Sequence, residues 1–79
     1  MTLDQVPLGT RARIVAVDWS LLAVEEAQRL VALGIEPDAF VTMAHRGVFA
    51  GRDPIALQVG RMTVALRRAH ARAMTVETT

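Results

Sequence analysis

The stretch Leu33-Gly34-Ile35-Glu36-Pro37-Asp38 ends a helical pattern, and three strand-like segments follow it before residue 67. Glycine at position 34 allows the left-handed backbone that stops a helix, and proline at position 37 favours a turn directly after it. Farther along, Gly51-Arg52-Asp53-Pro54 separates the first of these segments from the second. This order predicts a short helix that leads into a small antiparallel meander, with no room for a deep active site.

Alternation of apolar and polar residues predicts five short strands, at residues 10–18, 39–46, 54–59, 62–66 and 73–77. Residues 22–33 instead show a helical period, and Asp18 or Ser20 is suited to cap the start of that helix. Residues 67–72 have the composition of one helical turn. Because closing a sheet protects its edges, we predict a mostly-β, α+β fold. It is an SH3-like β-barrel of about five short strands, with one main helix inserted after the first strand.

The chain has 79 residues and is predicted to be one domain, residues 1–79. Hydrophobic residues make up 52% of it and aromatic residues only 4%, so mid-sized aliphatic side chains must fill the core. Trp19, beside the helix entrance, is interpreted as a lid on that core. The predicted core consists of Ile14, Val15, Val17, Leu30, Leu33, Val41, Ile55, Leu57, Val64 and Leu66.

The composition argues against several classes of function. Cysteine, lysine and tyrosine are missing, and Ser20, the single serine, lies outside a Gly-x-Ser-x-Gly setting, so we expect no enzyme. The net charge is +1, all nine basic residues are scattered arginines, and aromatic residues are few, so we expect no nucleic-acid partner. No apolar run approaches the length of a membrane span, so we expect a cytoplasmic protein without direct membrane insertion.

The two histidines, His45 and His70, are the residues best suited to bind a transition metal. They lie far apart in the sequence, and neither belongs to a His-x-x-His or His-Glu-x-x-His motif. We therefore predict no tight site for iron or zinc and no cofactor. Weak binding of Fe(II) or Zn(II) at surface histidines and carboxylates remains compatible with the sequence.

The segment between the second and third predicted strands is the best candidate for a docking tip. Val48 and Phe49 begin an apolar triplet that two glycines flank, and Arg46 and Arg52 lie just outside them. A few apolar anchors within a polar rim are typical of protein interfaces. The alternative is intramolecular, with Phe49 folded over the end of the barrel.

Four separated stretches together resemble the FeoA family of bacterial ferrous-iron transport accessory proteins. They are residues 30–38, Asp53-Pro54-Ile55-Ala56-Leu57, Ala65-Leu66-Arg67-Arg68-Ala69 and Met74-Thr75-Val76, and the early residues 8–12 fit the same pattern. The resemblance runs over nearly the whole chain, and it rests on the order and spacing of the motifs rather than on any one of them. One departure is Asp38, which stands where the family usually has glycine after proline.

The resemblance implies an SH3-like barrel that assists FeoB, the membrane ferrous-iron transporter with a cytosolic GTP-binding domain. It implies a cytoplasmic accessory or regulatory protein that acts as a protein-interaction module, and it carries no catalytic residues over to this chain. The alternative is a sensor or carrier that binds Fe or Zn itself. A carrier needs several convergent histidines or carboxylates, whereas a docking module needs an exposed apolar face that bears arginine.

Overall fold

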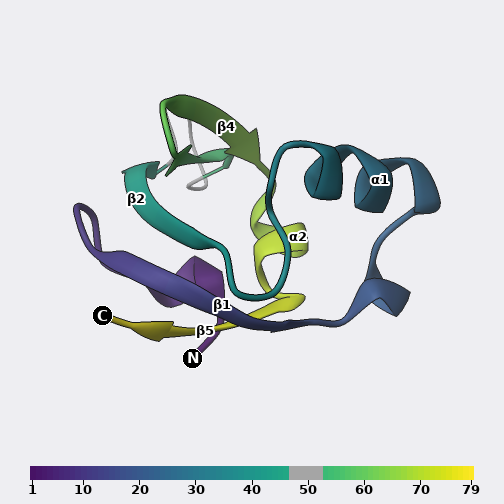
Figure 1. Ribbon diagram of the computed structural model, residues 1–79, viewed down its shortest axis with the longest axis horizontal. Coiled ribbons are helices and arrows are strands. Elements are labelled where there is room, and N and C mark those ends of the chain that lie inside the picture. The colour runs from purple at the N-terminus through teal and green to yellow at the C-terminus, as the bar shows by residue number, and fades with distance from the viewer. Residues whose placement is uncertain (47–52) are drawn as a thin grey trace.

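The computed structural model describes residues 1–46 and 53–79 and shows five strands curled around one core (Figure 1). The strands form one antiparallel sheet in the order β4-β3-β2-β1-β5. In chain order the elements are η1 (Leu3–Gln5), β1 (Arg11–Val17), η2 (Trp19–Leu21), α1 (Val24–Ala32), β2 (Phe40–Arg46), β3 (Ile55–Val59), β4 (Met62–Leu66), α2 (Arg68–Ala71) and β5 (Met74–Thr78). Each predicted strand is present, and its ends differ from the prediction by no more than one residue.

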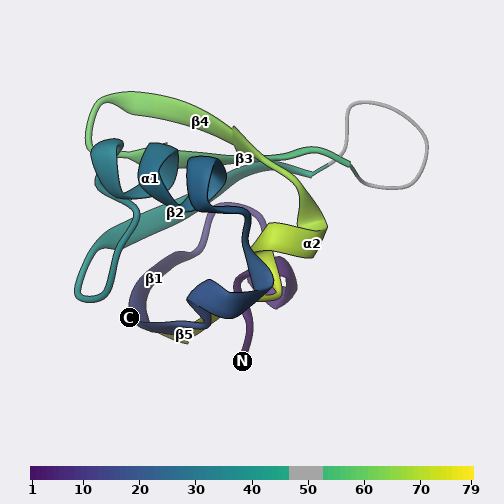
Figure 2. The ribbon, with the colours of Figure 1, turned by 90° about the vertical axis from the view of Figure 1, so that its right-hand side faces the viewer.

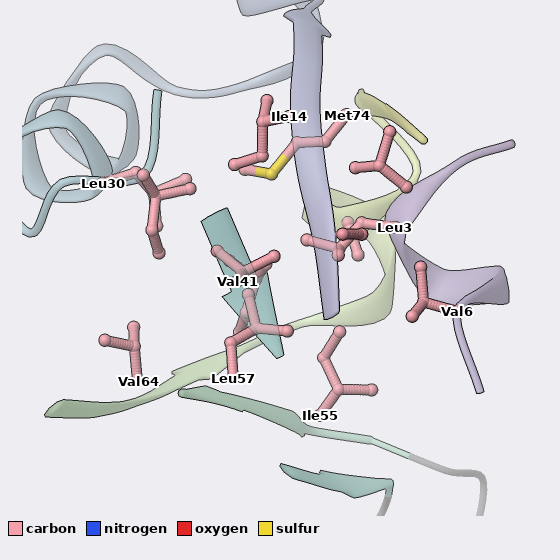
Figure 3. Close-up of a cluster of buried hydrophobic side chains, with 14 of the residues drawn as sticks. Leu3, Val6, Ile14, Leu30, Val41, Ile55, Leu57, Val64 and Met74 are labelled. Atoms are coloured by element: carbon pink, nitrogen blue, oxygen red, sulfur yellow. The ribbon is translucent and has the colours of Figure 1, made fainter. Parts of the chain in front are cut away.

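Buried apolar side chains from the strands, from α1 and from the N-terminal segment meet in one cluster inside the curled sheet (Figure 3). Leu57 on β3 is fully buried and lies between Met43 on β2 and Val64 on β4. Leu30 brings α1 into the same cluster. Seven of the ten predicted core residues are buried, namely Ile14, Leu30, Val41, Ile55, Leu57, Val64 and Leu66, while Val17 and Leu33 are partly buried against them.

The prediction for Val15 is wrong, because this side chain is 42% exposed. Ala12 and Ile14 face the core, so strict alternation along β1 turns Val15 outward. The pairing of β1 with β5 then shifts register between Ile14 and Ala16, and the irregularity turns Val17 back toward the core. Over these residues, therefore, only one face of β1 is buried.

The N-terminal segment, which sequence alone does not assign to the core, belongs to it. Leu3 in η1 is fully buried, and Val6 directly after η1 is 1% exposed. The backbone N–H of Val76 donates a 2.8 Å hydrogen bond to the carbonyl of Met1, and Thr2 forms a bridge with Thr75. The first residues therefore cover the outer edge of β5 and close one end of the core.

Helix α1 begins later than the sequence predicts. Asp18 caps the short η2 turn instead, where its carboxylate accepts a 3.2 Å hydrogen bond from the backbone N–H of Ser20. Ala23 is the N-cap of α1 and provides no side-chain hydrogen bond. Neither predicted cap therefore starts the main helix.

The end of α1 is the one that the sequence predicts. Gly34 has a φ of 88°, its N–H donates to the carbonyl of Val31, and the N–H of Ile35 donates to that of Leu30. These two bonds form a Schellman motif, which ends the helix. Asp38 has a φ of 74°, in the left-handed region that aspartate tolerates better than most residues. This conformation accounts for aspartate at a position where glycine is usual in the resembling family.

Candidate functional site

The outer face of α1 carries exposed apolar side chains. Val24 is 68% exposed and Val31 is 44% exposed, although both are aliphatic. Both views place α1 at the periphery, and no other element lies on its outer side (Figure 2). A shallow groove of about 430 Å³ is lined by Trp19, Ala27, Gln28, Val31 and Ala32. We call Val24 together with these five residues the α1 face.

The helix is apolar on two sides, which explains why this face exists. Leu30 is fully buried, and Leu33 packs on the core from the same side of the helix. Because successive residues turn by about 100°, Val24 and Val31 lie on a different side, roughly 60° wide, that also holds Gln28. The structure also corrects the prediction for Trp19, which is 38% exposed and lines the groove instead of closing over the core.

Charged residues border the α1 face along one side of the helix. The Arg29 guanidinium bonds the Glu26 carboxylate at 2.7 Å, and its Nη2 donates a 3.3 Å hydrogen bond to the Ala65 carbonyl on β4. Arg29 therefore ties α1 to the edge strand of the sheet. No ion pair within the described residues uses Glu25, which is exposed next to Arg29 on the helix surface.

A second charged cluster connects β1 to the turn before β2 and to β5. Arg13 contacts Asp38 at 2.8 Å and Glu77 at 2.7 Å. The hydrogen bond that Arg13 donates to Glu77, then the charges of Glu77 and Asp38, raise the pKa of Arg13 above its ordinary value. A raised pKa stabilises the fold at any pH below the ordinary value and loses this effect only as the pH rises past it, so Arg13 gives no pH dependence in the working range.

The two histidines lie in different surroundings. His45 is exposed on β2, whereas His70 on α2 is partly buried, with its Nδ1 3.8 Å from an oxygen of Glu26 and without a hydrogen-bond partner. Across residues 1–46 and 53–79, no three His, Cys, Asp or Glu side chains gather closely enough to hold a metal ion. The Glu26 carboxylate, which His70 approaches, already pairs with the Arg29 cation. The charge of Arg29 disfavours a metal cation at the same place. The described residues thus do not fit a resident metal.

The predicted docking tip lies outside the described residues. This applies to Val48, Phe49 and Arg52, and to the side chain of Arg46, whose backbone ends β2. A hollow of about 300 Å³ lies beside Pro54 and is lined in part by Asp53 and Arg67. The Asp53 carboxylate there accepts a 2.8 Å hydrogen bond from the backbone N–H of Arg68 and so caps α2. None of the described helices has the length and apolar character needed to cross a bilayer.

Comparison with known proteins identifies the family. The sequence pattern of the FeoA domain matches residues 1–78. The chain belongs to the FeoA family. FeoA is a small accessory domain associated with ferrous iron transport, and it is not a known enzyme family.

Solved structures agree with this assignment. Iron(II) transport protein A from Clostridium thermocellum is 26% identical to this chain, with a TM-score of 0.82. The match covers all of this chain but only 46% of the Clostridium thermocellum protein. FeoA from Stenotrophomonas maltophilia, solved as a zinc complex, is 34% identical with a TM-score of 0.76, covering 98% of this chain and 89% of that one. That FeoA is described as an SH3 domain protein, and the SH3-like fold predicted from the sequence is confirmed.

The same fold occurs in a different setting. A manganese-dependent transcriptional repressor superposes with a TM-score of 0.81 at 20% identity, over all of this FeoA chain and 41% of the repressor. At that identity the likeness concerns the fold alone. No curated protein sequence is similar enough to this chain to count as a match.

Proposed function

We propose that this FeoA protein is a cytoplasmic accessory module that binds the cytosolic part of a FeoB-type membrane transporter and regulates ferrous iron uptake. The match to the FeoA domain over residues 1–78 is the observation that carries this proposal. The 34% identity to an FeoA described as a possible activating factor of ferrous iron transport supports it.

Protein docking fits the described side chains better than metal transport does. A carrier needs carboxylates and imidazoles that are free to converge on an ion. Here the carboxylates of Glu26, Asp38, Asp53 and Glu77 are all engaged by arginine side chains or by a backbone N–H. Exposed apolar side chains, in contrast, are plentiful around α1, namely Trp19, Leu21, Val24 and Val31.

The docking tip proposed from the sequence gives the most direct test. Replacing Phe49 by serine is expected to lower the affinity for the transporter's cytosolic domain at least about tenfold, because interface anchors of this kind carry most of the binding energy. Isothermal titration with the purified cytosolic domain measures this affinity, and iron uptake by cells that carry the variant measures the consequence.

The matched control is Phe40→Ser, which removes the same side chain from β2, where it is 43% exposed. This variant is expected to keep transporter affinity. If Phe49→Ser binds the transporter as tightly as the unmodified protein, the docking tip is wrong. If Phe49→Ser mainly lowers the thermal midpoint, Phe49 is a lid of the barrel instead.

Direct metal binding is the second candidate function, and the zinc complex of the Stenotrophomonas maltophilia protein favours it. For this chain we expect no one-to-one binding of Fe(II) or Zn(II) below about micromolar concentration, because His45 and His70 lack a third convergent ligand among the described residues. Anaerobic calorimetry checks this expectation. Sub-micromolar binding that disappears in His45→Ala or His70→Ala would contradict it and favour the carrier.

A further inference from the structure

We propose that the α1 face is a self-association surface, on which a second copy of this chain packs its own α1 in the antiparallel direction. This inference does not depend on the proposed role in iron uptake. It rests on the exposed aliphatic side chains of α1, on the shape of the groove beside them, and on the charges that border it.

The first step concerns shape. Within the α1 face, Val24 projects into solvent with 68% of its surface exposed, whereas Ala27 and Ala32 leave the hollow of about 430 Å³. A projection and a hollow thus lie on one helix face, separated by one to two turns. A two-fold axis through Gln28 brings Val24 of each copy opposite Ala32 of the other, beside Val31. The surface is therefore its own complement, as an isologous dimer requires.

The second step concerns charge. In this arrangement the flank that carries Glu25 and Arg29 meets the same flank of the other copy, with the helix direction reversed. Glu25 has no ion-pair partner among the described residues, while Arg29 bonds Glu26 through Nε and Nη2 and keeps a 46% exposed side chain. In this register Arg29 of each copy lies opposite position 27 of the other, about 3 Å along the helix from Glu25, so the two side chains can reach each other on either side of the axis. With a net charge of +1, long-range repulsion between copies is slight.

The size of the helix sets the expected strength. Nine residues of α1 span about 13 Å, so two crossed helices bury less than the roughly 1,200 Å² typical of stable complexes. Trp19, which lines the groove, and the 61% exposed Leu21 next to α1 add apolar surface to the contact. We accordingly expect a weak, concentration-dependent dimer.

Sedimentation equilibrium over a wide range of protein concentrations tests the proposal. The average mass is expected to rise from the 8.6 kDa of the monomer toward twice that value. Val24→Glu should weaken association at least about tenfold, because it places a carboxylate in the apolar contact. Its control, Met62→Glu, alters an aliphatic side chain of β4 that is 46% exposed, and it should leave association unchanged. Because both sites are exposed, circular dichroism should show both variants folded.

Cross-linking tests the register, since the chain has no cysteine of its own. Gln28→Cys lies on the proposed axis, so a short bismaleimide should join two copies efficiently. Gln58→Cys is the matched control: Gln58 is exposed on β3 between the inward-facing Leu57 and the partly buried Val59, and it should cross-link only at the rate of random collision.

A mass that stays at the monomer value up to millimolar protein would overturn the proposal, and the α1 face would then be open to a different protein. Equal cross-linking of the Gln28 and Gln58 variants would overturn it as well. A dimer that Val24→Glu and Met62→Glu weaken to the same extent would place the contact elsewhere and would equally contradict the α1 pairing.

Discussion

Leu57→Ala is expected to lower the free energy of unfolding by about 2–5 kcal/mol, a large part of what a domain of this size possesses. Leu57 is fully buried on β3, with neighbours on both adjoining strands at Met43 and Val64, so the truncation leaves a cavity that little can fill. For a domain of 60–100 residues each lost kcal/mol lowers the thermal midpoint by about 4–8 °C. Urea titration and calorimetry should therefore both show a pronounced loss.

The control for this variant is Leu21→Ala, the same substitution at a side chain that is 61% exposed. It is expected to change stability by no more than about 0.5 kcal/mol. Both measurements belong at low protein concentration, because self-association would make the thermal midpoint depend on concentration. A Leu57→Ala protein with the thermal midpoint of the unmodified chain would show that β3 does not contribute this side chain to the core.

Local signals account for the parts of the fold that sequence predicts well. The strands β3 and β4 alternate cleanly, so their buried residues Leu57, Val64 and Leu66 follow from a period of two. Gly34 ends α1 because glycine readily adopts the left-handed backbone that stops a helix, and this preference belongs to the residue itself. In each of these cases the sequence near a residue contains the physical reason for its conformation.

Non-local contacts account for the parts that sequence does not predict. Val17 turns back toward the core because β5 pairs with β1 through a register shift that depends on residues some sixty positions away. The exposure of Val24 and Val31 follows from which apolar side of α1 meets the sheet, and the hydrogen bond from Arg29 to the Ala65 carbonyl on β4 helps to decide that side. The one local hint of the α1 face is the spacing of Val24 and Val31, which is two helical turns. The docking tip predicted at Val48 and Phe49 stays a prediction.

The N-terminal segment shows most clearly how tertiary structure decides burial. Leu3 lies in a 3₁₀ turn too short to have a hydrophobic period, and sequence offers only the reading of a lead-in before Pro7 and Gly9. In the structure this turn contacts both α2 and β5. Arg72, at the C-terminal end of α2, lies 3.8 Å from the Asp4 carboxylate. Burial of Leu3 thus depends on the last quarter of the chain.

Leu3→Ala is accordingly expected to cost about 2–5 kcal/mol, as much as the Leu57 variant, although it lies at the third residue of the chain. Leu3 has no exposed surface, and its removal opens the end of the core that η1 closes against Met74 and Val76. Leu8→Ala is the matched control, because Leu8 is 58% exposed in the turn before β1 and should be nearly neutral. Urea titration of the two variants side by side measures the difference. Equal stability of the Leu3 and Leu8 variants would mean that the N-terminal segment frays in solution and that residues 1–6 add little to the fold.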